Sequence, residues 1–107
     1  MDIDSVRMLV EAGDWYESAH FQERLAERGI TIEQVLEAIR VGRVIQELPP
    51  TGADPECIVC GDVERQIAFL KVVQPLYIVC AVGDVVTFVT ADWNPPREFG
   101  QKRRRRR

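Results

Sequence analysis

Apolar residues in the first forty positions recur with the spacing of amphipathic helices. The clearest run, residues 32–39, carries apolar side chains at i, i+3, i+4 and i+7. Thr31 precedes this run with a capping-box spacing to Gln34, and Gly42 follows it as a residue that commonly ends helices. The pattern predicts a helix that begins after Thr31 and ends before Gly42.

Two shorter helices are predicted before this one. An aspartate at position 2 or 4 is the expected N-cap of the first helix, which ends at Gly13. Residues 14–16 then form a connection to the second helix. Ser18 is the expected N-cap of that helix, and Gly29 stops it.

After Gly42 the apolar positions change to a strand-like pattern. Residues 44–48 are predicted to form a short strand, and the Pro-rich segment 49–55 is predicted to be a loop. Four further segments are rich in Val, Ile and Phe: residues 57–60, 65–73, 76–82 and 85–91. The turn signals between them are Gly61-Asp62, Gln74-Pro75 and Gly83-Asp84.

The last of these turn signals sets a predicted strand register. Gly83-Asp84 fits a two-residue turn of type II′. That hairpin pairs Val82 with Val85 and so places Tyr77 opposite Thr90.

Helices first and strands afterwards indicate the α+β fold class. We expect about three N-terminal helices packed on one face of an antiparallel sheet of about four strands. The segment 76–82 is apolar on both faces, so it is predicted to be the central strand.

Length and composition indicate a single domain. A chain of 107 residues, 46% of them hydrophobic, buries one modest core, so we expect residues 1–101 to form one α+β domain. Residues 102–107 form a basic tail that is expected to be disordered. The tail holds 6 of the 14 basic residues and none of the 17 acidic ones, so residues 1–101 keep 8 basic and 17 acidic residues, a net charge of −9.

No segment has the pattern of a signal peptide or a membrane span. Asp2, Asp4 and Glu11 interrupt the region where a basic start and an apolar run would lie. The longest apolar stretch, residues 76–89, is broken by Gly83-Asp84 and is too short to cross a bilayer as a helix. The three cysteines fit reduced thiols better than disulfides. These features predict a cytoplasmic protein without membrane association.

The second predicted helix concentrates the candidate chemistry. His20, Arg24 and Arg28 follow one another at four-residue spacing on one side of the helix, with Glu17 and Glu27 alongside. The two arginines repel each other, so either these glutamates on a salt-bridged surface helix or a bound phosphate is expected to compensate them. His20 lies in the first turn, where the helix dipole favours a neutral imidazole. Such an imidazole suits phosphodiester cleavage, because it takes a proton from a ribose 2′-hydroxyl while arginine stabilises the charge on the phosphate.

The cysteines have two interpretations. Cys57 and Cys60 have the spacing of half a zinc site, which Cys80 and His20 would complete. Residues three apart in a regular strand point to opposite faces, however, and free cysteines are usually buried. We therefore expect buried thiols and no bound metal.

Three further groups outside the second helix are candidate functional groups. Lys71 is predicted to share a strand and a face with Arg65, and it is either part of a site or an edge-strand lysine that discourages aggregation. Tyr77 is either a reactive hydroxyl or a core aromatic with a bonded hydroxyl. The basic tail is either a solvated run or an electrostatic contact for nucleic acid.

Several stretches together resemble a known bacterial family. They are His20…Arg24…Glu27-Arg28-Gly29-Ile30, Val44-Ile45, Glu56-Cys57-Ile58-Val59-Cys60-Gly61, Pro75-Leu76-Tyr77-Ile78-Val79-Cys80-Ala81, Val89-Thr90-Ala91 and the basic tail. Over about residues 16–107 the chain resembles a domain-of-unknown-function family that is regarded as related to the RelE- and MqsR-type toxins, and the HxxxRxxERGI pattern is the sharpest part of the match. His20, Arg24 and Arg28 match the family's helix motif, and Tyr77 stands where the family commonly has histidine.

The resemblance implies a toxin-like ribonuclease, of the mRNA interferase type, that needs no metal or other cofactor. Its partners would be RNA and a cognate antitoxin, of the kind with a YgiT-type zinc finger. The catalytic residues expected are His20, Arg24, Arg28, Lys71 and Tyr77. The RNA contacts expected are Arg65, Lys102, Arg103, Arg104, Arg105 and Arg106. The alternative is a non-catalytic module that binds RNA or protein on the same fold.

Overall fold

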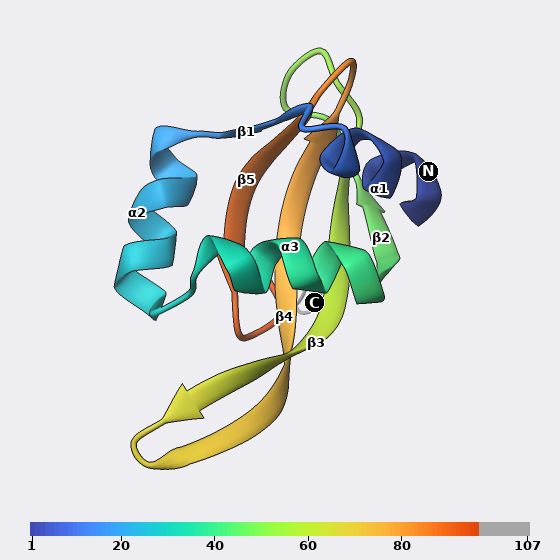
Figure 1. Ribbon diagram of the computed structural model, residues 1–107. Coiled ribbons are helices and arrows are strands. Elements are labelled where there is room, and N and C mark those ends of the chain that lie inside the picture. The colour runs from blue at the N-terminus through green and yellow to red at the C-terminus, as the bar shows by residue number, and fades with distance from the viewer. Residues whose placement is uncertain (97–107) are drawn as a thin grey trace, which may run out of the picture.

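A computed structural model describes residues 1–96 as three helices and five strands in one α+β unit (Figure 1). In chain order the elements are α1 (Ile3–Glu11), β1 (Trp15–Glu17), α2 (Ala19–Arg28), α3 (Ile32–Val41), β2 (Arg43–Leu48), β3 (Glu56–Ile67), β4 (Leu70–Val82) and β5 (Val86–Asp92). The α+β class and the helices packed on a sheet are confirmed, although the sheet has five strands rather than about four. The predicted domain end at residue 101 and the basic tail lie outside the described residues.

Local capping forms the three helices where the sequence predicts them. The side chains of Asp2, Ser18 and Thr31 each accept a hydrogen bond, 3.1 Å long, from the backbone N–H three residues later. The Gln34 side chain accepts in return from the Thr31 backbone N–H at 2.9 Å, which completes the capping box. Gly29 ends α2 in the left-handed conformation, with φ of 63°.

A short edge strand makes the sheet mixed rather than antiparallel. The strand order is β1-β5-β4-β3-β2, and β1 pairs in parallel with β5, with Trp15 beside Val86. The predicted connection at residues 14–16 and the purely antiparallel sheet are therefore wrong. Three residues are too few to show a periodic pattern, and their partner, β5, is the last strand within residues 1–96. The prediction that the segment after Pro75 is central is confirmed, because β4 is the third strand of the five.

Two turn signals lie inside long strands, so the turns predicted there are wrong. β3 passes through Gly61-Asp62 and β4 passes through Gln74-Pro75, with both strands paired along their whole lengths. The chain reverses instead after Ile67, where Ala68 has φ of 56°. Proline has no backbone N–H to donate to a neighbouring strand. β5 pairs with β4 only from Tyr77 onward, so this edge of β4 is free at Pro75 and the missing donor costs no hydrogen bond to β5.

The register between β4 and β5 also differs from the prediction. Val82 pairs with Val86, so the connection has three residues rather than two. A bulge between residues 79 and 80 shifts the register again, and Tyr77 pairs with Asp92 instead of Thr90. The three-residue connection and the bulge together set the register between β4 and β5, and no local sequence signal predicts the bulge.

The hydrophobic core lies between the helices and one face of the sheet (Figure 1). Its largest fully buried side chains include Phe21 of α2, Ile39 of α3, Ile78 of β4 and Phe88 of β5. Along β4 the core residues alternate with residues on the opposite face of the sheet, which is here called the far face. Tyr77 and its neighbours on that face form the candidate site described below.

Two glycines allow α3 to lie very close to β3. A Cβ atom added to Gly61 would collide with the backbone oxygen of Ala38 in α3 and would come within 2.8 Å of its Cα atom. A Cβ atom on Gly42 would collide with the backbone oxygen of Cys60. These glycines therefore serve close packing rather than a turn or a left-handed helix end.

Within residues 1–96 no helix combines the length and the apolar character that crossing a bilayer requires.

Candidate functional site

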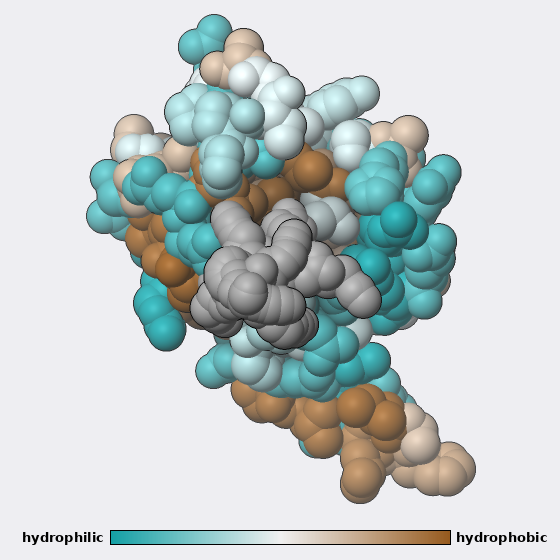
Figure 2. All heavy atoms as spheres, turned by 180° about the vertical axis from the view of Figure 1, so that it is seen from behind, coloured by the Kyte–Doolittle hydropathy of each residue, from teal (hydrophilic) through white to brown (hydrophobic). Residues whose placement is uncertain are grey.

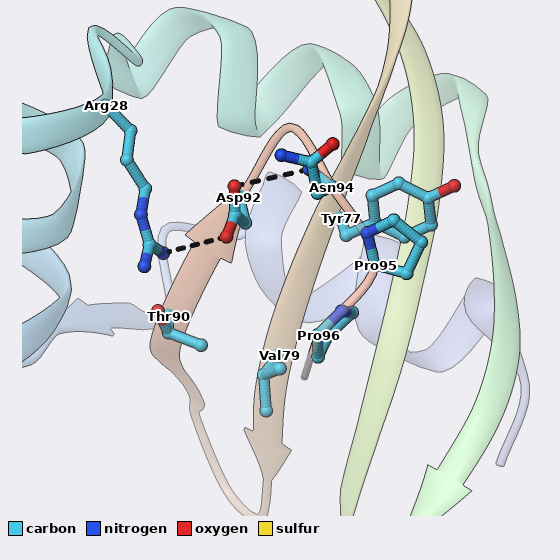
Figure 3. A pocket seen from close by; sticks show the side chains of 8 residues that line it. All are labelled: Arg28, Tyr77, Val79, Thr90, Asp92, Asn94, Pro95 and Pro96. Carbon is cyan, nitrogen blue, oxygen red and sulfur yellow. Dashed lines mark hydrogen bonds and ion pairs between the residues drawn. The ribbon is translucent and has the colours of Figure 1, made fainter. Parts of the chain in front are cut away.

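A pocket of about 520 Å³ lies on the far face, where α2, β4 and β5 come together (Figure 3). Its floor is made of two cross-strand pairs, Tyr77 with Asp92 and Val79 with Thr90. Arg28 closes one side of the pocket from the end of α2. The segment Asn94-Pro95-Pro96, which follows β5, closes another side and adds a polar amide beside the two rigid rings.

Arg28 is held at the pocket by contacts on both its side chain and its backbone. Its Nη1 donates to the backbone oxygen of Ala91 at 2.7 Å and lies 3.4 Å from Oδ2 of Asp92. Trp93 Nε1 donates to the backbone oxygen of Arg28 at 2.9 Å, which satisfies a carbonyl at the C-terminus of α2. The arginine is the last residue of α2, so its charge also complements the helix dipole.

Tyr77 lies across the pocket from Arg28 and extends its hydroxyl toward β3 (Figure 3). The hydroxyl and the thiol of Cys60 are hydrogen-bonded, in agreement with the cross-strand pairing of these two residues. Burial, together with Cys60 and the nearby Asp62 carboxylate, raises the pKa of Tyr77. The phenol therefore stays protonated at neutral pH and is a hydrogen-bond donor in the pocket.

Asp92 contacts both Arg28 and the segment that follows β5. One of its carboxylate oxygens lies beside Arg28, and the other accepts from the backbone N–H of Asn94 at 3.2 Å (Figure 3). Asp92, Asn94 and Thr90 were not predicted from the sequence as site residues. A cluster of polar residues at the end of a predicted strand, ahead of Pro95-Pro96, was the available signal.

His20 and Arg24 do not line this pocket, although they share α2 with Arg28. His20 is exposed in the first turn of the helix. The Arg24 guanidinium lies 2.7 Å from the Glu27 carboxylate, which is the surface ion pair that the sequence offered as one alternative. Of the five predicted catalytic residues, the pocket thus contains Arg28 and Tyr77.

Lys71 and Arg65 lie on the β3–β4 hairpin and do not line the pocket. The predicted common strand and common face for these residues are wrong, because the reversal after Ile67 places them on different strands, where Arg65 pairs with Val72 and Lys71 pairs with Gln66. The Arg65 guanidinium lies 4.2 Å from the centre of the Trp93 ring. Both cations border a smaller hollow of about 210 Å³. The predicted RNA contacts Lys102, Arg103, Arg104, Arg105 and Arg106 lie outside the described residues.

The cysteines are free and divide between the two faces of the sheet. Cys57 and Cys80 pair across β3 and β4 in the core, and their thiols are hydrogen-bonded. The bond from Cys80 lowers the pKa of Cys57, whereas that bond and complete burial raise the pKa of Cys80. Cys60 lies on the far face, where burial raises the pKa of its thiol. Residues 1–96 contain no group of three or more His, Cys, Asp and Glu side chains arranged to hold a metal ion.

Comparison with known families identifies a domain family. The model of a family described as "Domain of unknown function (DUF4258)" matches residues 18–91, which is more than half of the chain and runs from the N-cap of α2 almost to the end of β5. The matched part includes Arg28 and Tyr77, and it excludes α1, Asp92 and the segment beyond it. No curated protein and no solved structure matches the chain.

Proposed function

The chain belongs to the DUF4258 family, and from this membership and its far-face pocket we propose that it is a metal-independent endoribonuclease related to the RelE- and MqsR-type toxins. The observation that carries the proposal is the meeting of Arg28 and Tyr77, two residues expected in a catalytic site, in one pocket. They come from different elements, so a solvated helix surface alone does not explain their proximity. The RelE and MqsR relationship rests on the sequence resemblance.

Arg28 is suited to hold the scissile phosphate. Arginine has five N–H donors in a planar fork. Within the described part of the chain, both side-chain contacts of Arg28 use Nη1. The donors on Nε and Nη2 therefore remain for phosphate oxygens, with the charge already directed at the pocket.

Tyr77 and Asp92 are suited to the two proton transfers of RNA cleavage. The Asp92 carboxylate accepts the proton of the ribose 2′-hydroxyl as the 2′-oxygen forms its bond to phosphorus. The bond from phosphorus to the 5′-oxygen breaks, and the protonated phenol of Tyr77 donates a proton to that leaving oxygen. The products are a 2′,3′-cyclic phosphate and a 5′-hydroxyl, and Arg28 stabilises the charge on the phosphate during the step. In this scheme His20 and Arg24 bind the RNA backbone along α2.

Cleavage of a defined single-stranded RNA in the presence of EDTA tests the proposal. We expect Tyr77→Phe to lower the cleavage rate about 100-fold or more, which is the usual contribution of a general acid. Tyr16→Phe is the matched control, because Tyr16 is exposed on β1 and lines no part of the pocket. Product analysis should find the cyclic phosphate. Equal losses in the two variants would refute the role of Tyr77.

A second set of variants tests the residues on α2. Arg24→Gln should weaken RNA binding, whereas Arg40→Gln is its matched control, because each arginine forms an ion pair of 2.7 Å with a glutamate three residues away on its own helix. If His20→Ala abolishes cleavage while Tyr77→Phe leaves it intact, the catalytic site lies on α2 and the far-face pocket is not the site.

The second candidate is a non-catalytic module that binds RNA or protein. Arg24 and Arg28 both have carboxylate partners, Glu27 and Asp92, and residues 1–101 carry a net charge of −9, which favours this alternative. It predicts RNA binding without cleavage by the wild-type protein. The affinity would fall steeply as the salt concentration rises if Lys102–Arg107 supply the contacts, and deletion of those residues would remove that dependence.

As a toxin the protein would act in the cytoplasm, where its RNA substrates are, and it would be paired with a cognate antitoxin such as one with a YgiT-type zinc finger. Expression of the chain alone should then arrest growth, and co-expression of the product of the neighbouring gene should restore it. Arrest that persists in Tyr77→Phe would separate toxicity from cleavage.

A further inference from the structure

The two ends of the β3–β4 hairpin differ in exposure. At the turn, Phe69 is 98% exposed, and Figure 2 shows hydrophobic residues gathered on the hairpin where it extends from the body. At the opposite end, Cys57 of β3 and Cys80 of β4 have no exposed surface. Two thiols therefore lie in the core, and the proposed ribonuclease mechanism uses neither of them.

The register of the hairpin places these two cysteines directly opposite each other. Cys57 pairs with Cys80 in the antiparallel ladder, and their thiols are hydrogen-bonded. The Cα atoms of directly opposed residues in such a ladder are about 4.5–5.5 Å apart. A disulfide needs a Cα separation of about 4.4–6.8 Å. The reduced pair is therefore already within the range that a disulfide can bridge.

The third cysteine lies on the other side of the sheet. Cys60 is opposite Tyr77 on the far face, whereas Cys57 and Cys80 belong to the hydrophobic core. Side chains on the two faces of a sheet point away from each other, so a disulfide from Cys60 to either core thiol would have to pass through the sheet. The folded chain therefore permits an intrachain disulfide only between Cys57 and Cys80.

The hydrogen bond between the two thiols also distinguishes their reactivities. It lowers the pKa of Cys57, although burial opposes this effect, and it raises the pKa of Cys80 together with burial. The thiolate is the nucleophile in thiol oxidation. Cys57 is therefore suited to react first with an oxidant, and Cys80 is suited to resolve the product.

We propose that Cys57 and Cys80 are an oxidation site that forms a core disulfide with hydrogen peroxide as the oxidant. The Cys57 sulfur attacks one peroxide oxygen, the O–O bond breaks, and the leaving oxygen departs as water with the Cys57 thiol proton, which leaves a sulfenic acid. The Cys80 sulfur attacks the Cys57 sulfur, the S–O bond breaks, and the hydroxyl group leaves as a second water with the Cys80 thiol proton. The two thiols lose two electrons, which reduce the peroxide. The proposal does not depend on the proposed ribonuclease activity.

Full burial means that peroxide reaches Cys57 only when the structure opens locally. Cys57 is the second residue of β3, and the segment 49–55 before this strand is exposed throughout. Strand ends beside exposed loops open more readily than the centre of a sheet. Oxidation of the pair should therefore be slow, and opening of this end of the hairpin should limit its rate.

Three variants that each keep two cysteines test the proposal. Cys60→Ala keeps the core pair, whereas Cys57→Ala and Cys80→Ala are matched controls whose remaining thiols lie on opposite faces. Each folded protein is treated with hydrogen peroxide and alkylated with iodoacetamide in denaturant, and the masses of the protein and its peptides are measured. Cys60→Ala should lose two hydrogen atoms, resist alkylation and yield peptides linked through Cys57 and Cys80, and dithiothreitol should reverse these changes.

The controls should form no intrachain disulfide, while oxidation of their Cys60 shows that the peroxide acted. Circular dichroism before the treatment confirms that each variant is folded. A core pair that stays fully alkylatable while Cys60 is oxidised in the controls overturns the proposal. Equal amounts of intrachain disulfide in all three variants also overturn it, because the bonds would then form in unfolded chains.

Thermal unfolding of Cys60→Ala measures whether the disulfide fits the native strands. The bond closes the loop from Cys57 to Cys80 and so restricts the unfolded chain. The oxidised form should unfold at a midpoint higher than that of the reduced form by on the order of 10 °C. A midpoint that is unchanged or lower would mean that the bond distorts the strands, and the proposal of a preformed pair would be wrong.

Discussion

Replacing Gly61 with alanine tests whether this glycine serves close packing or a turn. A glycine in the middle of a strand costs about 0.5–1 kcal/mol relative to alanine, so Gly61→Ala would stabilise the protein by that amount if the site had room. The structure leaves no room, because the new Cβ would collide with the Ala38 oxygen and lie 2.8 and 2.9 Å from two further backbone atoms of Ala38. Overpacking of a rigid core costs about 1–3 kcal/mol. The net result should be a destabilisation of about 1–2 kcal/mol.

Urea unfolding followed by circular dichroism measures this change, with all variants at one protein concentration. The midpoint of thermal unfolding should fall by roughly 5–15 °C in Gly61→Ala. Gly52→Ala is the control, since nothing lies within 4 Å of the position that a Cβ would take at this residue, in the loop before β3. The control should stay within about 0.5 kcal/mol of the wild type. A Gly61→Ala protein that is as stable as the wild type, or more stable, would refute the packing argument.

Three further predictions concern the far face and its supports. Burial raises the pKa of Tyr77, so the neutral phenol contributes stability at pH values below the unfolded-state pKa of about 10, and this contribution is lost as the pH rises through the folded-state pKa. Urea unfolding at about pH 9 and at about pH 11.5 should show that the wild type loses stability relative to Tyr77→Phe as the pH rises. The opposite trend would contradict the direction of the pKa shift. Trp93→Phe removes the donor to the Arg28 carbonyl and should cost about 1–2 kcal/mol in the same unfolding assay, whereas no cost would mean that water replaces the bond. Iodoacetamide at pH 8 should modify the partly exposed Cys60 before the buried Cys80, as peptide mass spectrometry would detect, and the reverse order would contradict the assigned faces.

The helices could be predicted in detail because their signals are local. Ser18 and Thr31 cap helices through atoms three residues away, and Gly29 ends α2 through its own backbone conformation. The apolar spacing of residues 32–39 likewise reports one face of one helix. The sequence located the segments that form strands, but Gly61 and Pro75 inside the long hairpin were interpreted as turn residues. In the structure, Gly61 permits close packing against α3, and Pro75 lies where one edge of β4 is free.

The candidate site was only partly predictable for the same reason. The motif on α2 drew attention to His20, Arg24 and Arg28 as one group, because their spacing places them on one side of a helix. The structure divides the group, since only Arg28 lies at the end of the helix where β5 leaves the sheet and its side chain reaches Asp92. The pairing of Tyr77 with Asp92 depends on a bulge between β4 and β5 that no local sequence pattern predicts.

The sequence by itself determined the fold class, the three helices with their caps and the central position of the strand after Pro75. Each of these follows from hydrophobic period and short-range hydrogen bonding. Only the tertiary structure decided that β1 joins the sheet in parallel, that Arg28 and Tyr77 share a pocket, and that Phe69 lies exposed in the turn between β3 and β4. These features depend on contacts between residues far apart in the chain, whose energies come from the packing of whole elements rather than from any one segment.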